Sequence, residues 1–487
     1  MNRRQFLSQS TCAALSSSAI FNTLFHLSAI GRAWAAAGDP ITDYKGLVCV
    51  FLKGGNDSNN LLIPTAGANA APYLQWRGAL AVPANTALAI DAPLTAQPSG
   101  NIYGFHPRFG DVTGLANSGI RKLWNDQKLA VVANVGSLLF PTTKAQYQAG
   151  SVPLPPQLFS HSDQQVQWQS SIPDQPFQTG WGGRMADLMA AANTALGAQI
   201  SISMTLAGAN SYQVGVATSA YAVGTNGSIP FTGYGDNYIN AQNPNTNAGR
   251  RLAAFRNITG LADSHLLKNG YGTIINRAYD ADRLLSTALA GYPATAEPFT
   301  YFGTGTLSAQ LRMVARLIAA KDQLSQKRQI FFCELDGFDT HSTQLGDHDP
   351  LLIELNEGLY QFQRALEFLN LGDKVTTFTA SDFSRTLTPN SGDATLVGSD
   401  HAWGGHQLVM GGAVKGGDIY GTIPVLSANS PDDVESSTGR GRWIPTLSVD
   451  EYAATLARWF GVTGTPLNTV FPNLARFSHP DLGFMQA

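Results

Sequence analysis

The stretch that decides the fold is residues 329–341, QIFFCELDGFDTH. Its first half is a short apolar run, typical of a β-strand that is buried on both faces of a sheet. Its second half is a polar loop that carries Asp336, Asp339 and His341. A buried strand that ends in such a loop predicts a parallel sheet with functional side chains at its carboxyl edge.

Other segments repeat this pattern. Apolar runs that end in polar or glycine-rich loops lie at 47–52, 129–135 and 375–379. Segments with helical periodicity lie at 307–321, 351–371 and 449–459. Ser448 is a suitable N-cap for the last of them. The alternation predicts a doubly wound α/β fold with a mostly parallel sheet flanked by helices.

Residues 197–247 interrupt the alternation. Short runs of Thr, Ser, Val and Tyr are broken there by Gly and Asn, and 237–247 is rich in Asn. This composition predicts a small β-rich insertion, an antiparallel piece or cap over the sheet, followed by a loop. No internal repeat or linker is visible, so we expect a single domain over residues 36–487.

The composition excludes several classes of protein. Of 487 residues, 44% are hydrophobic and 13% are charged, and the net charge is −3. A chain with so much apolar content and so little charge is not disordered. Lys and Arg form no long run, which argues against nucleic acid as a partner and against a polybasic membrane tether.

The first 35 residues look like a twin-arginine export signal. Arg3 and Arg4 precede Phe-Leu, an apolar stretch follows, and Ala33 and Ala35 form an A-x-A cleavage site. We expect export by the twin-arginine machinery to the periplasm or the medium, and no membrane anchor in the mature form. The alternative is a first helix that is retained.

Cys49 and Cys333 both lie in apolar runs. Such positions are typical of buried free thiols. A disulfide between neighbouring strands is the alternative in an oxidising compartment.

Further Asp and His side chains follow the predicted strands. Asp57 follows the first strand, Asp382 follows a later one, and the next loop contains Asp400, His401 and His406. Together with Asp336, Asp339 and His341, these side chains predict a site for a divalent metal such as Zn, Mn, Ca or Mg. Each Asp taken alone also suits a helix N-cap or a turn.

Ser160 lies between a Pro-rich loop and a predicted helix at 163–170. A serine there is suited to nucleophilic attack, because a helix N-terminus favours an alkoxide and a bound anion. Ser162 is the second choice, and either serine alternatively caps the helix. Arg385 is suited to bind phosphate or sulfate, whereas we expect Arg184 to form a structural salt bridge. Lys53 either contacts an anion or is solvated.

At these residues the sequence resembles an exported bacterial family catalogued as domain of unknown function 1501. The matching motifs are GGND at 54–57, SH at 160–161, GWGGR at 180–184, FDTH at 338–341, SDFSRT at 381–386 and DH at 400–401. The resemblance covers nearly all of the mature chain.

That family resembles the alkaline phosphatase–sulfatase superfamily. The resemblance implies metals at the strand ends, with Asp57 as a ligand, Ser160 as the nucleophile, and His406 or His401 as the last ligand. Superfamily members have Thr-Ala-Asp-His where this chain has TASDF at 379–383. Phe383 stands where a ligand histidine is expected, which favours one metal over two.

Two functions follow from these expectations. The first is an exported metal-dependent hydrolase of phosphate or sulfate esters, including phosphorylated or sulfated glycans, with Ser160 as nucleophile and Arg385 stabilising the transition state. The second is a non-catalytic secreted binding or assembly protein that keeps the fold. The Asp and His set favours the first function, and Phe383 favours the second.

Overall fold

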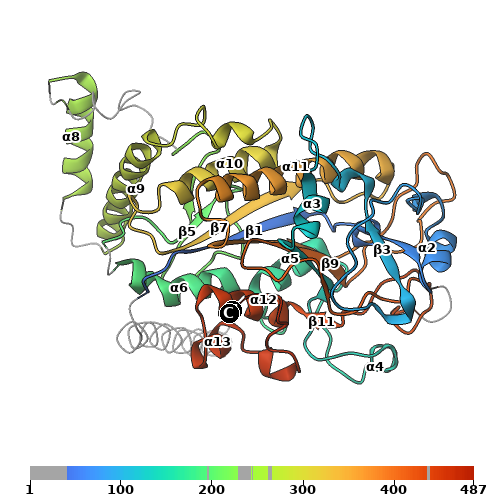
Figure 1. The fold of residues 1–487 in the computed structure, drawn as a ribbon. Coiled ribbons are helices and arrows are strands. Elements are labelled where there is room, and N and C mark those ends of the chain that lie inside the picture. The colour runs from blue at the N-terminus through green and yellow to red at the C-terminus, as the bar shows by residue number, and fades with distance from the viewer. Residues whose placement is uncertain are drawn as a thin grey trace, which may run out of the picture.

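The computed structural model describes residues 41–194, 197–228, 243, 245–261, 266–435 and 439–486. The predicted export signal and most of the Asn-rich loop lie outside these residues. The described part is a three-layer α/β arrangement, with helices on both faces of a central sheet (Figure 1).

The central sheet is mixed and has nine described strands. β1 (Lys45–Lys53) lies between β7 (Arg328–Asp336) and β8 (Val375–Ser381) and pairs with both in parallel. β9 (Gly405–Met410) is antiparallel to its two neighbours, β8 and β4 (Leu129–Gly136). Two short strands, β10 (Ile419–Tyr420) and β11 (Leu447–Ser448), pair in parallel with β4. The prediction of a mostly parallel sheet is confirmed, with β9 reversed.

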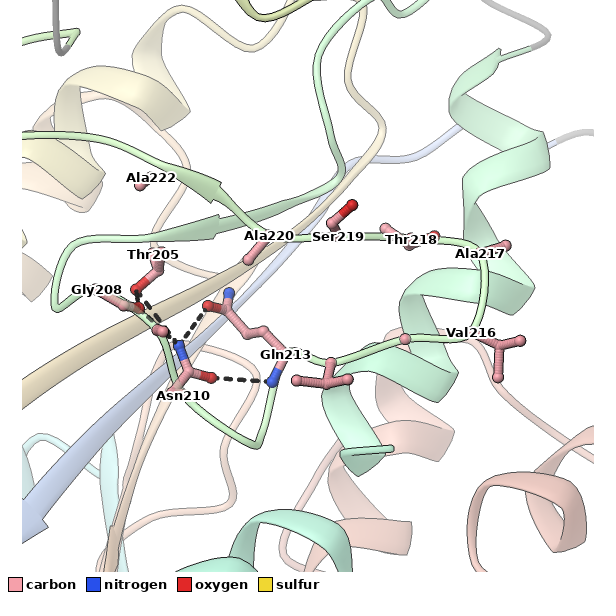
Figure 2. A pocket seen from close by; sticks show the side chains of 13 residues that line it. Thr205, Gly208, Asn210, Gln213, Val216, Ala217, Thr218, Ser219, Ala220 and Ala222 are labelled. Carbon is pink, nitrogen blue, oxygen red and sulfur yellow. Dashed lines mark hydrogen bonds between the residues drawn. The ribbon is translucent and has the colours of Figure 1, made fainter. Parts of the chain in front are cut away.

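β5 (Ser203–Thr205) and β6 (Tyr221–Ala222) lie in the segment that we expected to form an antiparallel piece or cap over the sheet. β5 pairs in parallel with β7, and β6 pairs in parallel with β5, so they extend the main sheet at its edge. Their connection borders a pocket of about 390 Å³, where the Asn210 amide donates to the side-chain oxygens of Thr205 and Gln213 (Figure 2). The prediction of an antiparallel piece was therefore wrong.

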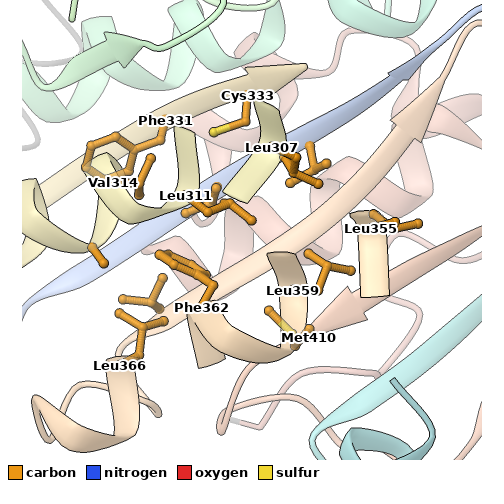
Figure 3. Packing of buried hydrophobic residues seen from close by; sticks show 14 of the residues in the cluster. Leu307, Leu311, Val314, Phe331, Cys333, Leu355, Leu359, Phe362, Leu366 and Met410 are labelled. Carbon is orange, nitrogen blue, oxygen red and sulfur yellow. The ribbon is translucent and has the colours of Figure 1, made fainter. Parts of the chain in front are cut away.

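Different helices cover the two faces of the sheet. On one face, α10 (Thr306–Ala319) and α11 (Gln344–Phe368) pack Leu311 and Phe362 against the strands (Figure 3). The other face is covered by α6 (Trp181–Thr194), α12 (Val449–Phe460) and α13 (Thr465–Val470). Burial on both faces explains why the central strands are nearly continuous apolar runs.

Cys49 and Cys333 lie on opposite faces of the sheet. Cys49 lies opposite Phe332 in the β1–β7 register, so Cys49 and Cys333 are one position out of step. Their side chains consequently pack into the cores on opposite faces of the sheet. Both are buried free thiols, as predicted, and the disulfide alternative was wrong.

The predicted helices are present with small shifts in their bounds. α10 and α12 match the predicted segments, and Ser448 caps α12 in a capping box with Glu451. α11 begins at Gln344 rather than at Leu351, and Pro350 inside it lacks the N–H of one helical hydrogen bond without ending the helix.

Smaller elements surround this core. Towards one end lie a two-stranded antiparallel sheet and short helices, namely β2 (Leu62–Ala66), β3 (Ile102–Phe105), α2 (Ala70–Arg77), α3 (Gly119–Asn125), α4 (Lys144–Ala149) and α5 (His161–Ser170). Towards the other end, α8 (Asn247–Thr259) and α9 (Leu266–Ala290) project beyond the sheet (Figure 1). None of the described helices combines the length and apolar character needed to span a bilayer.

Candidate metal centre

The candidate site lies where the loops after β1, β7 and β8 meet. Gly54 and Gly55 follow β1 with φ values of 113° and 85°. A Cβ on Gly54 would collide with the backbone of Asp339, and one on Gly55 would collide with the ring of Phe383. Glycine is required at both positions by conformation and by space.

Four donor atoms converge at this edge. The Nε2 atom of His401 lies 3.1 Å from Nε2 of His161 and 2.8 Å from Nε2 of His341. The Oδ1 atom of Asp339 lies 3.4 Å from Nε2 of His161, 3.1 Å from that of His341 and 3.4 Å from that of His401. We call His161, Asp339, His341 and His401 the four-donor cluster.

Three separate segments supply the cluster. His161 is the first residue of α5, and Asp339 and His341 lie in the loop after β7. His401 lies before β9, where the backbones of Arg385 and His401 form a β-bridge. Asp339, His341 and His401 therefore come from loops at the carboxyl edge of the parallel strands, and His161 reaches this edge from a helix start.

The separations fit a single cation. Zn–N and Zn–O bonds of about 2.0–2.1 Å place the ligand atoms of a tetrahedral site about 3.3–3.4 Å apart. His161, Asp339 and His401 have ligand atoms that all lie within 4.8 Å of one another, and their separations of 3.1 to 3.4 Å lie at or just below this value. His341 lies close to His401 and Asp339 but outside this group of three. The three residues thus have the spacing of a mononuclear site, with His341 beside it.

The second ring nitrogen, Nδ1, of each cluster histidine faces a hydrogen-bond acceptor. Nδ1 of His401 lies 2.7 Å from the carbonyl oxygen of Phe159, which can only accept a proton. Nδ1 of His161 lies 2.7 Å from Asp382 Oδ2, and Nδ1 of His341 lies 3.0 Å from Asp400 Oδ1. When each Nδ1 carries the proton, the Nε2 lone pairs of His161 and His341 both face Nε2 of His401, and a cation held by His161, His401 and Asp339 would satisfy two of these lone pairs.

The two supporting carboxylates are themselves held in place. Asp382 is fully buried and accepts hydrogen bonds from the Gly54 N–H and the Gln165 amide. Asp400 pairs with Arg440 and accepts a hydrogen bond from Asn390. Asp382 and Asp400 therefore face the outer nitrogens of the histidines, and their direct binding to a metal stays a prediction.

Electrostatics favour the ligating forms of two members. Burial lowers the pKa of His401, which keeps its ring neutral at pH 7. Burial raises the pKa of Asp339, but the Arg385 guanidinium outweighs it and the net shift is downward. The hydrogen bond to Asp382 raises the pKa of His161, outweighing the opposing effect of burial.

Three predicted ligands have other partners. Asp57 is buried, pairs with Arg77, and also accepts hydrogen bonds from the Gln344 amide and the Asn59 N–H. Asp336 is largely exposed and lies 3.6 Å from Lys53. His406 is buried in β9, and its Nδ1 accepts a hydrogen bond from the Asn134 N–H. Their polar atoms make these contacts instead of joining the cluster.

Phe383 forms a wall of the site. Its ring centroid lies 4.7 Å from that of His161 and 4.6 Å from that of His401. The side chain is buried and offers no donor atom. Phe383, which stands where a ligand histidine was expected, therefore packs against the two imidazoles.

Ser160 occupies the N-cap position of α5 without capping it. Its hydroxyl makes no bond to the first-turn amides and instead lies 2.6 Å from Asp163 Oδ2. Ser162 Oγ lies 3.2 Å from Ser160 Oγ. The predicted helix start is confirmed, and the hydrogen-bonded capping role for Ser160 was wrong.

The three predicted cationic residues differ in their partners. Arg385 is fully buried and donates to Asp339 Oδ1 at 2.9 Å, while its Nε and Nη2 atoms have no partner among the described residues. Arg184 donates to the backbone carbonyls of Val470, Thr179 and Ser170, so the predicted salt bridge was wrong. Lys53 pairs with Glu334 at 3.3 Å.

His161 was missed as a ligand by the sequence reasoning. It belongs to no strand end, because a segment that contains α4 separates β4 from α5. The available signal was its position beside Ser160 at a predicted helix start, where a side chain can face the same edge.

Together, the fold and the cluster define an α/β protein with a candidate mononuclear metal centre at the carboxyl edge of its sheet. Residues 235–466 match a family model described as "Protein of unknown function (DUF1501)". This range includes Asp339, His341 and His401 and leaves out His161. No curated protein matches the chain.

Proposed function

We propose that the protein is an exported hydrolase of phosphate or sulfate esters that uses one metal ion. The observation that carries the proposal is the four-donor cluster, in which three histidines direct Nε2 inward and hold Nδ1 against acceptors. The mostly parallel sheet, with its donors at the carboxyl edge, supports an alkaline-phosphatase-like fold.

The donor set narrows the choice of metal. Three imidazoles and one carboxylate suit Zn²⁺ or Mn²⁺, whereas Ca²⁺ and Mg²⁺ prefer oxygen ligands. When bound, such an ion supplies Lewis-acid polarisation of an ester oxygen. Side chains of Asp339 and His341 are 48% and 45% exposed, so one side of the cluster is open to a substrate.

The surrounding side chains suit an anionic ester, including a phosphorylated or sulfated glycan. We assign Ser160 as the nucleophile, because it lies at the N-terminus of α5 beside His161 and its hydroxyl hydrogen-bonds to Asp163. Asp163 accepts the hydroxyl proton as Ser160 Oγ bonds to phosphorus or sulfur. The alkoxide of the ester leaves and takes up that proton, and water then hydrolyses the seryl phosphate or sulfate and frees Ser160. Arg385 fixes the Asp339 carboxylate and adds positive charge at the site.

The test uses the purified chain without added metal, then with Zn²⁺ or Mn²⁺. Metal content is measured by plasma mass spectrometry, and hydrolysis is measured with 4-nitrophenyl phosphate, 4-nitrophenyl sulfate and a panel of natural esters. Metal-dependent turnover supports the proposal. Absence of bound metal after loading with either ion contradicts it.

A non-catalytic binding or assembly protein is the second candidate. A movement of His341 towards His161 would complete a shell of four protein donors, which is typical of structural zinc sites. In that case the chain binds one ion per molecule, loses stability when a chelator removes it, and hydrolyses none of the esters. A stable metal complex without turnover decides for this second function.

Ser160→Ala tests the nucleophile. We expect hydrolysis to fall by at least about 100-fold, because the attacking oxygen is removed, while metal content stays unchanged. Stability should change little, since Ser160 makes no capping hydrogen bond. Ser162→Ala is the matched control and should keep its activity. Full activity in Ser160→Ala would remove this serine from the mechanism.

Export is tested by replacing Arg3 and Arg4 with lysine. The twin-arginine motif is the reason for the proposed location. We expect unprocessed precursor to accumulate in the cytoplasm, as seen by immunoblotting of cell fractions. Normal processing of the double variant would show that the chain is not exported by this route.

A further inference from the structure

The α8–α9 hairpin exposes large apolar side chains on a projecting part of the molecule. Ile258, Leu261, Tyr271 and Ile274 are 69%, 70%, 66% and 67% exposed. Only Leu252 and Tyr279 form the small buried core assigned between these helices, and the C-terminal half of α9 joins the main core. The hairpin therefore presents its apolar side chains away from the body of the protein.

The four side chains lie close to one crossing of the helices. A Cβ on Gly272 would collide with the carbonyl oxygen of Thr259, so the two backbones touch there. Each of the four exposed residues is within two positions of Thr259 or Gly272. They are therefore gathered in the described residues on either side of this contact, and exposed apolar side chains gathered in one region mark interaction surfaces.

The hairpin is also strongly basic. Six of its described side chains are exposed and basic, namely Arg250, Arg251, Arg256, Lys268, Arg277 and Arg283. The sequence from 247 to 290 has three acidic residues, Asp263, Asp280 and Asp282, against these six basic ones, so its net charge is +3. The whole chain has a net charge of −3, so the positive charge is concentrated here.

We propose that the region of α8 and α9 around Ile258, Leu261, Tyr271 and Ile274 binds the surface of an anionic lipid bilayer. Exposed apolar side chains beside basic residues are the pattern by which helices insert shallowly into a lipid interface. Charge complementarity favours an anionic bilayer over a second copy of this chain, because two copies would bring like charges together. The basic residues are spread from 250 to 283, so no run of one sign reveals them.

The test is sedimentation with lipid vesicles. A chain beginning at Ala36 is used, so that the predicted signal does not contribute to binding. We expect it to sediment with vesicles rich in phosphatidylglycerol, not with pure phosphatidylcholine, and to be released by high salt. Equal binding to both lipids, or none to either, overturns the proposal.

Two double variants separate the apolar and the charged contributions. Ile258→Ser with Ile274→Ser should weaken partitioning about tenfold by removing inserted apolar area. Arg250→Gln with Arg277→Gln should weaken it by a similar factor and reduce its salt dependence. Leu94→Ser with Leu396→Ser is the control, because both leucines are exposed outside the hairpin and should leave binding unchanged.

Binding of a second copy of the chain to this surface, instead of lipid, would give a different experimental result. If the hairpin joins two copies of the chain, sedimentation velocity shows a dimer that the Ile258→Ser, Ile274→Ser variant dissociates, and the lipid proposal fails. Circular dichroism establishes that each variant is folded. Metal content and ester hydrolysis should be unchanged in all variants, so this proposal and the proposed function can fail separately.

Discussion

His401→Ala abolishes stoichiometric metal binding by the purified protein. His401 is the central member of the cluster, since its Nε2 atom lies 3.1 Å and 2.8 Å from the other two Nε2 atoms. Loss of a group that merely supports a ligand weakens metal binding about 10–100-fold, and loss of a ligand should exceed that range. The measurement is metal content by mass spectrometry, with affinity from competition against a chelator.

Two other variants serve as comparisons for the metal binding of His401→Ala. Asp382→Asn removes the charge that faces His161 and should weaken metal binding within the 10–100-fold range. His479→Ala is the matched control, because His479 is an exposed histidine that contacts Ser478 and Glu451. One bound ion per chain in His401→Ala, at unchanged affinity, would show that the cluster is not a metal site.

Arg77→Met is expected to lower the free energy of unfolding by about 3–5 kcal/mol. Asp57 and Arg77 are both fully buried, and removing the guanidinium leaves a carboxylate without its cation. Burial raises the pKa of Asp57 even with Arg77 and Arg385 nearby. Urea denaturation followed by circular dichroism measures the change, and metal content should stay the same in the folded variant.

The control for Arg77→Met is an exposed ion pair. Lys128→Met breaks the contact with Glu367, and exposed pairs of this kind contribute about 0–1 kcal/mol. If Arg77→Met leaves stability unchanged, or if Asp57→Asn removes bound metal from a folded chain, then Asp57 belongs to the metal site and our structural role for it is wrong.

The strands were predictable where burial leaves a mark in the sequence. The runs at 47–52, 329–334 and 375–379 are apolar because both faces of β1, β7 and β8 are covered. The direction of β9 was not predictable, because an apolar run reads the same in parallel and antiparallel pairing. β5 and β6 were misread because strands of two or three residues are too short to show a period.

The candidate site was predictable in part for a similar reason. The rule that strand ends carry functional groups found Asp339, His341 and His401, but it says nothing of the direction of a side chain. Asp57 accepts a hydrogen bond from Asn59 in the turn that follows it, which is the capping alternative. His161 reaches the cluster from a helix start, and only the fold brings that position to the strand ends.

The four donors lie between positions 161 and 401, so no local stretch of the chain can hold the ion before the sheet is assembled. Metal loading must therefore follow tertiary folding. The twin-arginine route carries chains that have already folded. Under the proposed export, the ion is acquired from the cytoplasmic pool, and the cytoplasm rather than the destination sets which metal the protein carries.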